Sequence, residues 1–104
     1  MDTPRITIND KTFEPSPPTM QVWRRTVDFV NADKTQWTVD ELGQRYLSYI
    51  VHAFNRPEVT AEGVEKALLA CDLIPTGAAL ANWVYLQIIP RLDKLPNGET
   101  PPGD

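Results

Sequence analysis

The sequence is poor in the side chains from which most active sites and metal centres are built. Among its 104 residues there is a single cysteine, Cys71, and a single histidine, His52. One cysteine cannot form a disulfide within the chain, and no pair of Cys or His residues has the spacing of a zinc site. The five glycines are far apart, which excludes a glycine-rich phosphate loop. We therefore expect no cofactor and no metal, and we predict that the protein is not an enzyme.

The two scarce residues are also predicted to be unreactive. His52 falls on the polar side of a predicted helix with Arg45 and Ser48, which indicates a solvated surface histidine. Cys71 shares an apolar stripe with Val64, so we expect a buried, inert thiol.

Clustered basic residues and long apolar runs are lacking as well. The formal net charge is −4, and Arg24 and Arg25 are the only adjacent basic residues. Because nucleic-acid-binding domains usually gather Lys and Arg on one face, nucleic-acid binding is not expected. No apolar run approaches the ~18 residues of a membrane-spanning helix. The N-terminus lacks the pattern of a secretory signal, so the expected location is the cytoplasm, with no membrane partner.

The chain does have the composition of a globular domain. Hydrophobic residues make up 41% and charged residues 23% of the sequence, which is ordinary for a soluble protein. A chain of this length can bury one modest core. We predict a flexible N-terminus over residues 1–4, a single helical domain over residues 5–92 and a flexible polar tail over residues 93–104.

The first predicted element is a β-hairpin over residues 5–14. Two short strands, Ile6–Ile8 and Lys11–Phe13, flank Asn9 and Asp10, which favour a tight two-residue turn. A lone hairpin is marginally stable in water, so it must pack on its own helices or gain strands from another molecule. The prolines after it predict an extended connector: Pro15, Pro17 and Pro18.

Hydrophobic periodicity and capping residues predict about four helices after this connector. They run from about Thr19 to Asn31, from the cap Thr38 to the stop at Asn55, from the cap Thr60 to a break at Asp72, and from Thr76 or Gly77 to Ile89 before Pro90. The predicted fold class is therefore mainly α, with an N-terminal β-hairpin and a small bundle of about four helices (α+β by strict count).

The apolar positions of each helix predict which face is buried. For the first helix the expected stripe is Met20, Trp23, Val27 and Val30. The second helix has the capping-box residues Thr38 and Glu41, and its expected core face is Leu42, Tyr46, Tyr49, Ile50, Ala53 and Phe54. The last helix is apolar nearly all round, so it is either central in the bundle or covered by a partner.

The aromatic and arginine residues on the first and last helices are the best candidates for a partner-binding site. Trp23 lies beside Arg24 and Arg25, and Trp83 and Tyr85 lie on the apolar last helix. Trp, Tyr and Arg are enriched in interface hot spots. The alternative is that the aromatic rings belong to the core and the arginines are simply solvated.

Four segments occur in an order that resembles a known family: Ile6–Pro15, Trp23–Phe29, Val59–Val64 and Asp72–Pro75, the last before a helix that contains Trp83. The resemblance extends over most of residues 5–90. In this order the four segments resemble the tail assembly chaperones of long-tailed bacteriophages, particularly the small chaperones of siphophages that infect Gram-positive bacteria.

The resemblance implies a mostly helical protein that acts in the host cytoplasm and is absent from the mature virion. It also implies binding to the tape measure protein, recruitment of the tail-tube protein through a longer frameshifted form, and self-association into a homo-oligomer. One alternative is a structural tail-completion or head–tail connector protein that stays in the particle. A second alternative is a small DNA-binding regulator, which the acidic charge balance disfavours.

Overall fold

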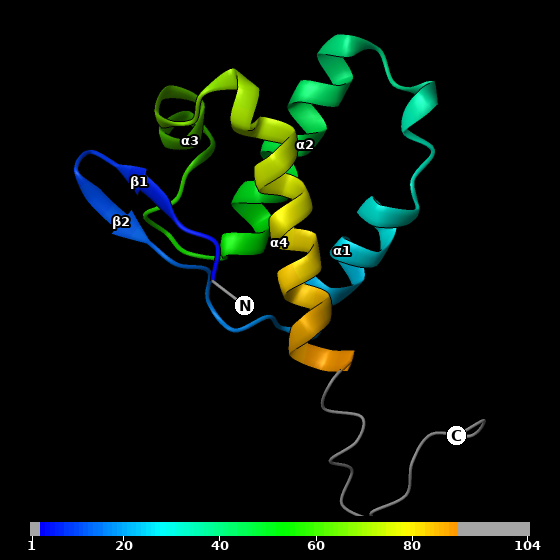
Figure 1. The fold of residues 1–104 in the computed structure, drawn as a ribbon, viewed down its shortest axis with the longest axis horizontal. Coiled ribbons are helices and arrows are strands. Elements are labelled where there is room, and N and C mark those ends of the chain that lie inside the picture. Colours follow the sequence, from blue (N-terminus) through cyan, green and yellow to red (C-terminus); the bar gives the residue numbers. More distant parts are fainter. Residues whose placement is uncertain (1–2, 90–104) are drawn as a thin grey trace, which may run out of the picture.

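A computed structural model describes residues 3–89 of the chain (Figure 1). In chain order the elements are β1 (Ile6–Ile8), β2 (Lys11–Phe13), α1 (Met20–Asn31), the 3-10 helix η1 (Lys34–Gln36), α2 (Val39–Phe54), α3 (Ala61–Ala67), the 3-10 helix η2 (Ala70–Asp72) and α4 (Leu73–Ile88). This order confirms the predicted fold class, a mainly helical protein with an N-terminal antiparallel hairpin. Residues 1 and 2, the predicted stop at Pro90 and the predicted tail lie outside the described residues.

The hairpin has the predicted register and turn. Ile6 pairs with Phe13 and Ile8 with Lys11. Asn9 and Asp10 adopt φ angles of 52° and 67°, the left-handed values that a tight two-residue hairpin turn of type I′ requires. Because β1 packs against α3, the hairpin is supported by the helices of its own chain (Figure 1).

The proline-rich connector is held against the end of α2. Ser16 donates its backbone N–H to the carbonyl of Phe54 at 2.9 Å, and Arg56 donates to the carbonyl of Glu14. Pro15 is buried in this contact region. These contacts hold the connector between the hairpin and α1 against the C-terminal end of α2.

Threonine caps begin three of the helices: Thr38 and Thr60 were predicted as caps, and Thr19 is a further one. The side chains of Thr19, Thr38 and Thr60 each accept a hydrogen bond from the backbone N–H three residues later. Thr38 and Glu41 form the complete capping box, and the backbone hydrogen bond from Thr38 is the main reason that the pKa of the Glu41 carboxyl is lowered. Each cap contributes about 1 kcal/mol to the stability of its helix. At the other end of α2, Asn55 adopts a left-handed conformation and terminates the helix.

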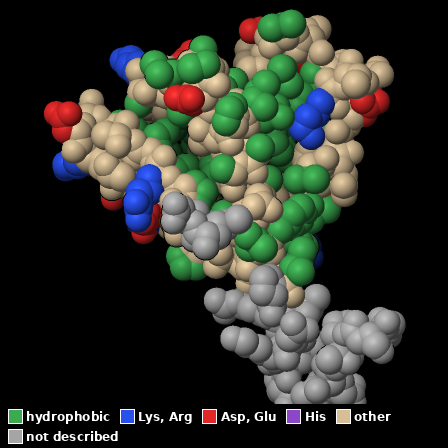
Figure 2. Space-filling view, viewed as in Figure 1, with side chains coloured by type: hydrophobic (Ala, Val, Ile, Leu, Met, Phe, Trp, Pro, Cys, Tyr) green, Lys and Arg blue, Asp and Glu red, His purple; other side chains and the backbone are tan. Residues whose placement is uncertain are grey.

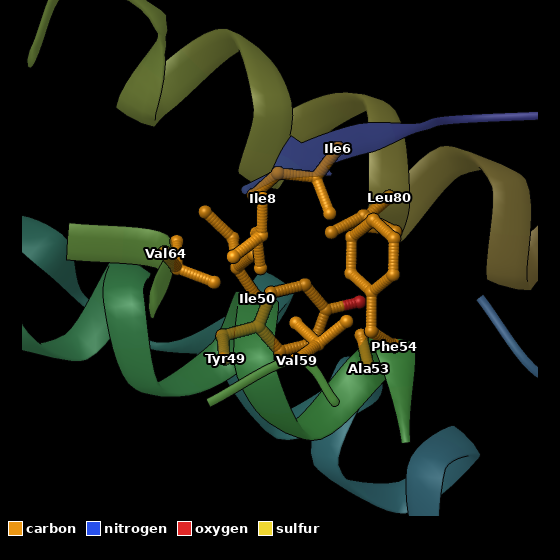
Figure 3. Packing of buried hydrophobic residues seen from close by; sticks show 10 residues of the cluster. Ile6, Ile8, Tyr49, Ile50, Ala53, Phe54, Val59, Val64 and Leu80 are labelled. Carbon is orange, nitrogen blue, oxygen red and sulfur yellow. The ribbon is translucent and has the colours of Figure 1, made fainter. Parts of the chain in front are cut away.

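The main core is built around α2, which packs against α1, α3 and α4. Its buried side chains come from β1, α2, the loop before α3, α3 and α4. Figure 3 shows several of them converging: Ile6, Ile8, Tyr49, Ile50, Ala53, Phe54, Val59, Val64 and Leu80. The predicted core face of α2 is confirmed, except that Leu42 is only half-buried.

The predicted buried stripe of α1 is wrong. The fully buried residues of this helix are Val22 and Thr26, whereas Met20 is 63% exposed and Val30 is also exposed. Val22 packs with Trp83 and Val84 of α4. Thr26 is a polar residue, but its hydroxyl forms hydrogen bonds inside the protein with the carbonyl of Val22 and the hydroxyl of Tyr49. Its burial therefore costs little, and α1 is rotated about its axis relative to the predicted orientation, with Thr26 facing the core.

The break between the last two helices lies earlier than predicted. The helix α4 begins at Leu73, and Pro75 sits in its first turn, where the missing backbone N–H has no intrahelical acceptor to lose. Because α3 already ends at Ala67, the apolar stripe of α3 is not continued as far as Cys71. Cys71 is therefore exposed on η2, and the prediction of a buried thiol is wrong.

Candidate protein-docking surfaces

The five predicted interface residues do not form one site: the three aromatic residues pack together, and the two arginines lie apart from them. The rings of Trp23 and Tyr85 meet edge to face with their centroids 5.1 Å apart, which joins α1 to α4, and Trp83 is buried beside them in the core. Arg24 is exposed. Arg25 donates instead to the hydroxyl of Ser48 on α2 at 2.9 Å. A role of these residues in partner binding stays a prediction.

An apolar groove that is open to solvent lies where the first half of α2 meets α3, η2 and the start of α4. We call it the docking groove; its volume is about 460 Å³. The residues that line it include Val39, Asp40, Gly43, Leu47, Glu65, Leu68, Leu69 and Leu73. Val39, Gly43 and Leu47 are spaced four residues apart, so they form one stripe along α2.

Two apolar side chains of the docking groove are largely open to solvent. Val39 is 88% exposed and Leu69 is 65% exposed. Both belong to one groove with the half-buried Leu47 and Leu68, so they are parts of a continuous apolar surface. Contiguous exposed apolar surface is typical of a site where another protein binds.

Gly43 opens the floor of the docking groove. A Cβ atom added at this position would meet no heavy atom within 4 Å, so the packing of the chain itself does not require glycine here. Glycine within a helix costs about 0.5–1 kcal/mol relative to alanine. This glycine therefore weakens α2 and leaves room for a side chain from another molecule.

The charged residues that line the docking groove, Asp40 and Glu65, have one sign. Both are exposed carboxylates, and no Lys or Arg side chain lines the groove. An apolar floor with acidic edges favours a partner whose apolar residues are flanked by basic ones.

A second apolar surface follows the exposed side of α4. We call it the outer face of α4, and it consists of Ile74, Ala78, Asn82, Leu86 and Ile89, the last directly after the helix. Their spacing of three or four residues places them on one side of the helix. Figure 2 shows hydrophobic side chains gathered along the course of α4 on the face turned to the viewer.

The outer face of α4 continues into a shallow groove shared with α1. This groove has a volume of about 290 Å³, and Val30 and Tyr85 line it together with Ala78 and Asn82. Val30 belongs to the stripe that was predicted to be buried. One residue that the sequence placed in the core of α1 thus lines this surface groove.

A third groove, between α1 and α2, is polar. Arg45 lies over the ring of Trp37 at 4.9 Å and pairs with Glu41 at 3.7 Å. Arg25 and Asp28 also line this groove, so its positive and negative charges are balanced. Such a surface does not select a ligand of either sign.

His52 does not have the solvated position that was predicted. Its side chain is half-buried, and its Nε2 atom is buried without a hydrogen-bond partner among the described residues. Within residues 3–89, no group of three His, Cys, Asp or Glu side chains is arranged to hold a metal ion.

Searches against protein-family models, curated proteins and solved structures find no match to this chain. Over residues 3–89, no single helix is both long and apolar enough to cross a membrane, and α3 and α4 reach that composition only as a pair separated by a bend of 111°.

The sequence reasoning missed the docking groove because its residues come from four elements, α2, α3, η2 and α4. Val39 directly follows a helix cap, and Leu69 lies in the break before η2, so neither stands out in a periodic pattern. The available signal was Gly43, because a glycine in the interior of a strongly predicted helix makes that helix less stable than alanine would.

Proposed function

We propose that this protein is a bacteriophage tail assembly chaperone that binds a tape measure protein in the docking groove, keeps it soluble and helps to recruit tail-tube subunits. The observation that carries this proposal is the open apolar groove with the exposed side chains Val39 and Leu69. The order of the hairpin and the helices, which resembles these chaperones, supports the choice of client. The proposed role needs no catalytic group.

The shape of the docking groove suits one face of an amphipathic helix. Helices that bind in grooves insert apolar residues spaced three or four positions apart. The gap above Gly43, between Val39 and Leu47 on α2, offers room for one such side chain, and Leu68 and Leu69 provide the opposite wall. Covering the apolar face of a long helical client prevents that face from aggregating, which is the physical basis of the proposed solubilising effect.

The negative charge of the docking groove favours some segments of the client over others. Asp40 and Glu65 attract a helix with Lys or Arg beside its apolar residues. We expect Glu65→Lys to weaken binding, and Asp28→Lys, which makes the same change of charge on α1, to leave binding nearly unchanged. Because the contact is at the surface, the effect of Glu65→Lys should diminish at high salt.

The decisive experiment is co-expression of the full chain with a helical fragment of the tape measure protein encoded beside it. The wild-type chain should raise the soluble yield of the fragment several-fold, and Leu69→Lys should abolish most of that gain. Met20→Lys is the matched control, because Met20 is 63% exposed, nearly as much as Leu69, and lies outside the groove. No gain with the wild type, or equal losses with the two variants, would contradict the proposal.

A structural tail-completion or connector protein is the alternative, and it would use the same groove inside the particle. A chaperone is expected to remain in the host cytoplasm and to be absent from the mature virion. Mass spectrometry of purified virions separates the two roles, because only the structural protein would be present in many copies per particle.

A further inference from the structure

We propose that the outer face of α4 is a self-association surface, on which α4 of a second copy packs antiparallel about a two-fold axis near Asn82. This surface is separate from the docking groove, and the inference does not depend on the identity of the client. It rests on the distribution of charge and of side-chain size along the outer face of α4.

The outer face of α4 is exposed and has no charged residue. Ile74, Leu86 and Ile89 are 48%, 38% and 52% exposed. Along the whole of α4 there is no Asp, Glu, Lys or Arg. From Ile74 to Ile89 this face extends over about 22 Å, which is long enough for two helices to pack along it.

The net negative charge of the chain disfavours contact between two copies through their acidic surfaces. Each copy carries a formal charge of −4, so two copies repel each other through surfaces on which carboxylates lie. The docking groove is such a surface, because Asp40 and Glu65 line it. The outer face of α4 has no charged residue, and the groove beside it is lined by the single charged side chain Lys34, whose Nζ donates to the carbonyl of Phe29. A second copy can therefore cover this face without bringing carboxylates of the two copies together.

Small and large side chains occupy different positions along the outer face of α4. Toward its N-terminal end the outer face has the small Ala78, and toward its C-terminal end it has the large Leu86 and Ile89. A two-fold axis at Asn82 places Ala78 of one copy opposite Leu86 of the other. The same axis brings Ile74 of one copy near Ile89 of the other. Asn82 then meets its own copy at the axis, and on either side of it the large Leu86 meets the small Ala78, which allows close helix packing.

A parallel arrangement would fit this surface less well. It would place Leu86 against Leu86 and leave a gap between the two copies of Ala78. The antiparallel arrangement also brings opposite ends of the two helix dipoles together. It is isologous, so the same patch of each copy is buried and the assembly closes as a dimer.

The test uses the full chain and two charged substitutions on the outer face of α4. Sedimentation velocity over a range of protein concentrations should show a dimer for the wild type. Ala78→Glu alone and Leu86→Lys alone should each raise the dissociation constant at least about tenfold, because a charge is buried without a partner. In the double variant the new Glu faces the new Lys of the other copy, so dimerisation should recover.

Circular dichroism and thermal unfolding of each variant show whether a loss of dimer reflects a loss of folding. The double variant also reports the geometry, because a parallel pair would bring Glu against Glu and would not recover. Leu69→Lys, which alters the docking groove, should leave the dimer intact. A loss of dimerisation can therefore be distinguished from a loss of client binding. A monomeric wild type, or single variants that dimerise normally, would overturn the proposal. A folded double variant that stays monomeric would overturn the antiparallel arrangement.

Discussion

The hydroxyl groups of Thr26 and Tyr49 lie 2.8 Å apart where α1 packs on α2, and both side chains are fully buried. Thr26 donates its own proton to the carbonyl of Val22 at 2.8 Å, so Tyr49 is the donor in the contact between the two hydroxyls. The ring of Phe29 stacks on Tyr49 with the centroids 4.3 Å apart. This polar contact inside an apolar layer fixes the rotation of α1.

A double-mutant cycle tests the coupling of the two hydroxyls. Thr26→Val should lower the free energy of unfolding by about 1–3 kcal/mol, because it leaves the buried hydroxyl of Tyr49 without its partner. Tyr49→Phe should cost less, about 0.5–1.5 kcal/mol, since Thr26 keeps its hydrogen bond to Val22. Urea denaturation of the double variant should show a cost below the sum. Strictly additive costs would mean that the two hydroxyls do not interact.

The same tyrosine predicts a loss of stability at alkaline pH. Burial raises the pKa of Tyr49 to about 12, against about 10 in an unfolded chain. The unfolded state therefore loses this proton first, and the contribution of Tyr49 to stability, up to about 2–3 kcal/mol, is lost as the pH rises from about 10 to 12. The check is the difference in unfolding free energy between the wild type and Tyr49→Phe, measured across this range. A difference that does not change with pH would contradict the prediction.

Two helical glycines should respond in opposite ways to the same substitution. Gly43→Ala should raise the free energy of unfolding by about 0.5–1 kcal/mol, because its Cβ meets open space. Gly77→Ala should lower it by about 1–3 kcal/mol, because its Cβ would lie 2.6 Å from Cδ2 of Tyr46, where α4 approaches α2. Thermal unfolding of the two variants provides a direct comparison, and effects of the same sign would contradict this account of the two sites.

A larger substitution at the first of these glycines tests the docking groove. Gly43→Leu fills the space above α2 and should abolish most of the solubilising effect on the tape measure fragment, while Gly43→Ala should retain more of it. Both variants should remain folded, because the added atoms point into the groove. If Gly43→Leu solubilises the fragment as well as the wild type, the client binds elsewhere on the protein.

The buried nitrogen of His52 predicts a stabilising substitution. Its Nε2 atom has no hydrogen-bond partner among the described residues, and an unsatisfied buried polar group costs about 1–3 kcal/mol. His52→Leu should therefore raise the urea midpoint of unfolding, whereas His52→Gln, which keeps a polar group, should not. A lower midpoint for the leucine variant would show that the imidazole contributes to stability through its present position.

The sequence by itself determined the local structure of this protein. The hairpin turn at Asn9 and Asp10, the capping box of Thr38 and Glu41, and the core face of α2 each depend on residues that are close in the chain. Turn propensity, capping and helical periodicity act over only a few residues, so they can be recognised without knowing what lies across the core.

The tertiary structure decided which way α1 and α4 face and which apolar residues stay exposed. Thr26 is buried because Tyr49, 23 residues away, supplies a hydroxyl to it, and Cys71 is exposed because the chain turns before reaching it. The docking groove exists because Val39 and Leu69 come together from different elements. The burial of a side chain depends on the neighbours that distant segments supply, and the residues next to it in the chain do not specify those neighbours.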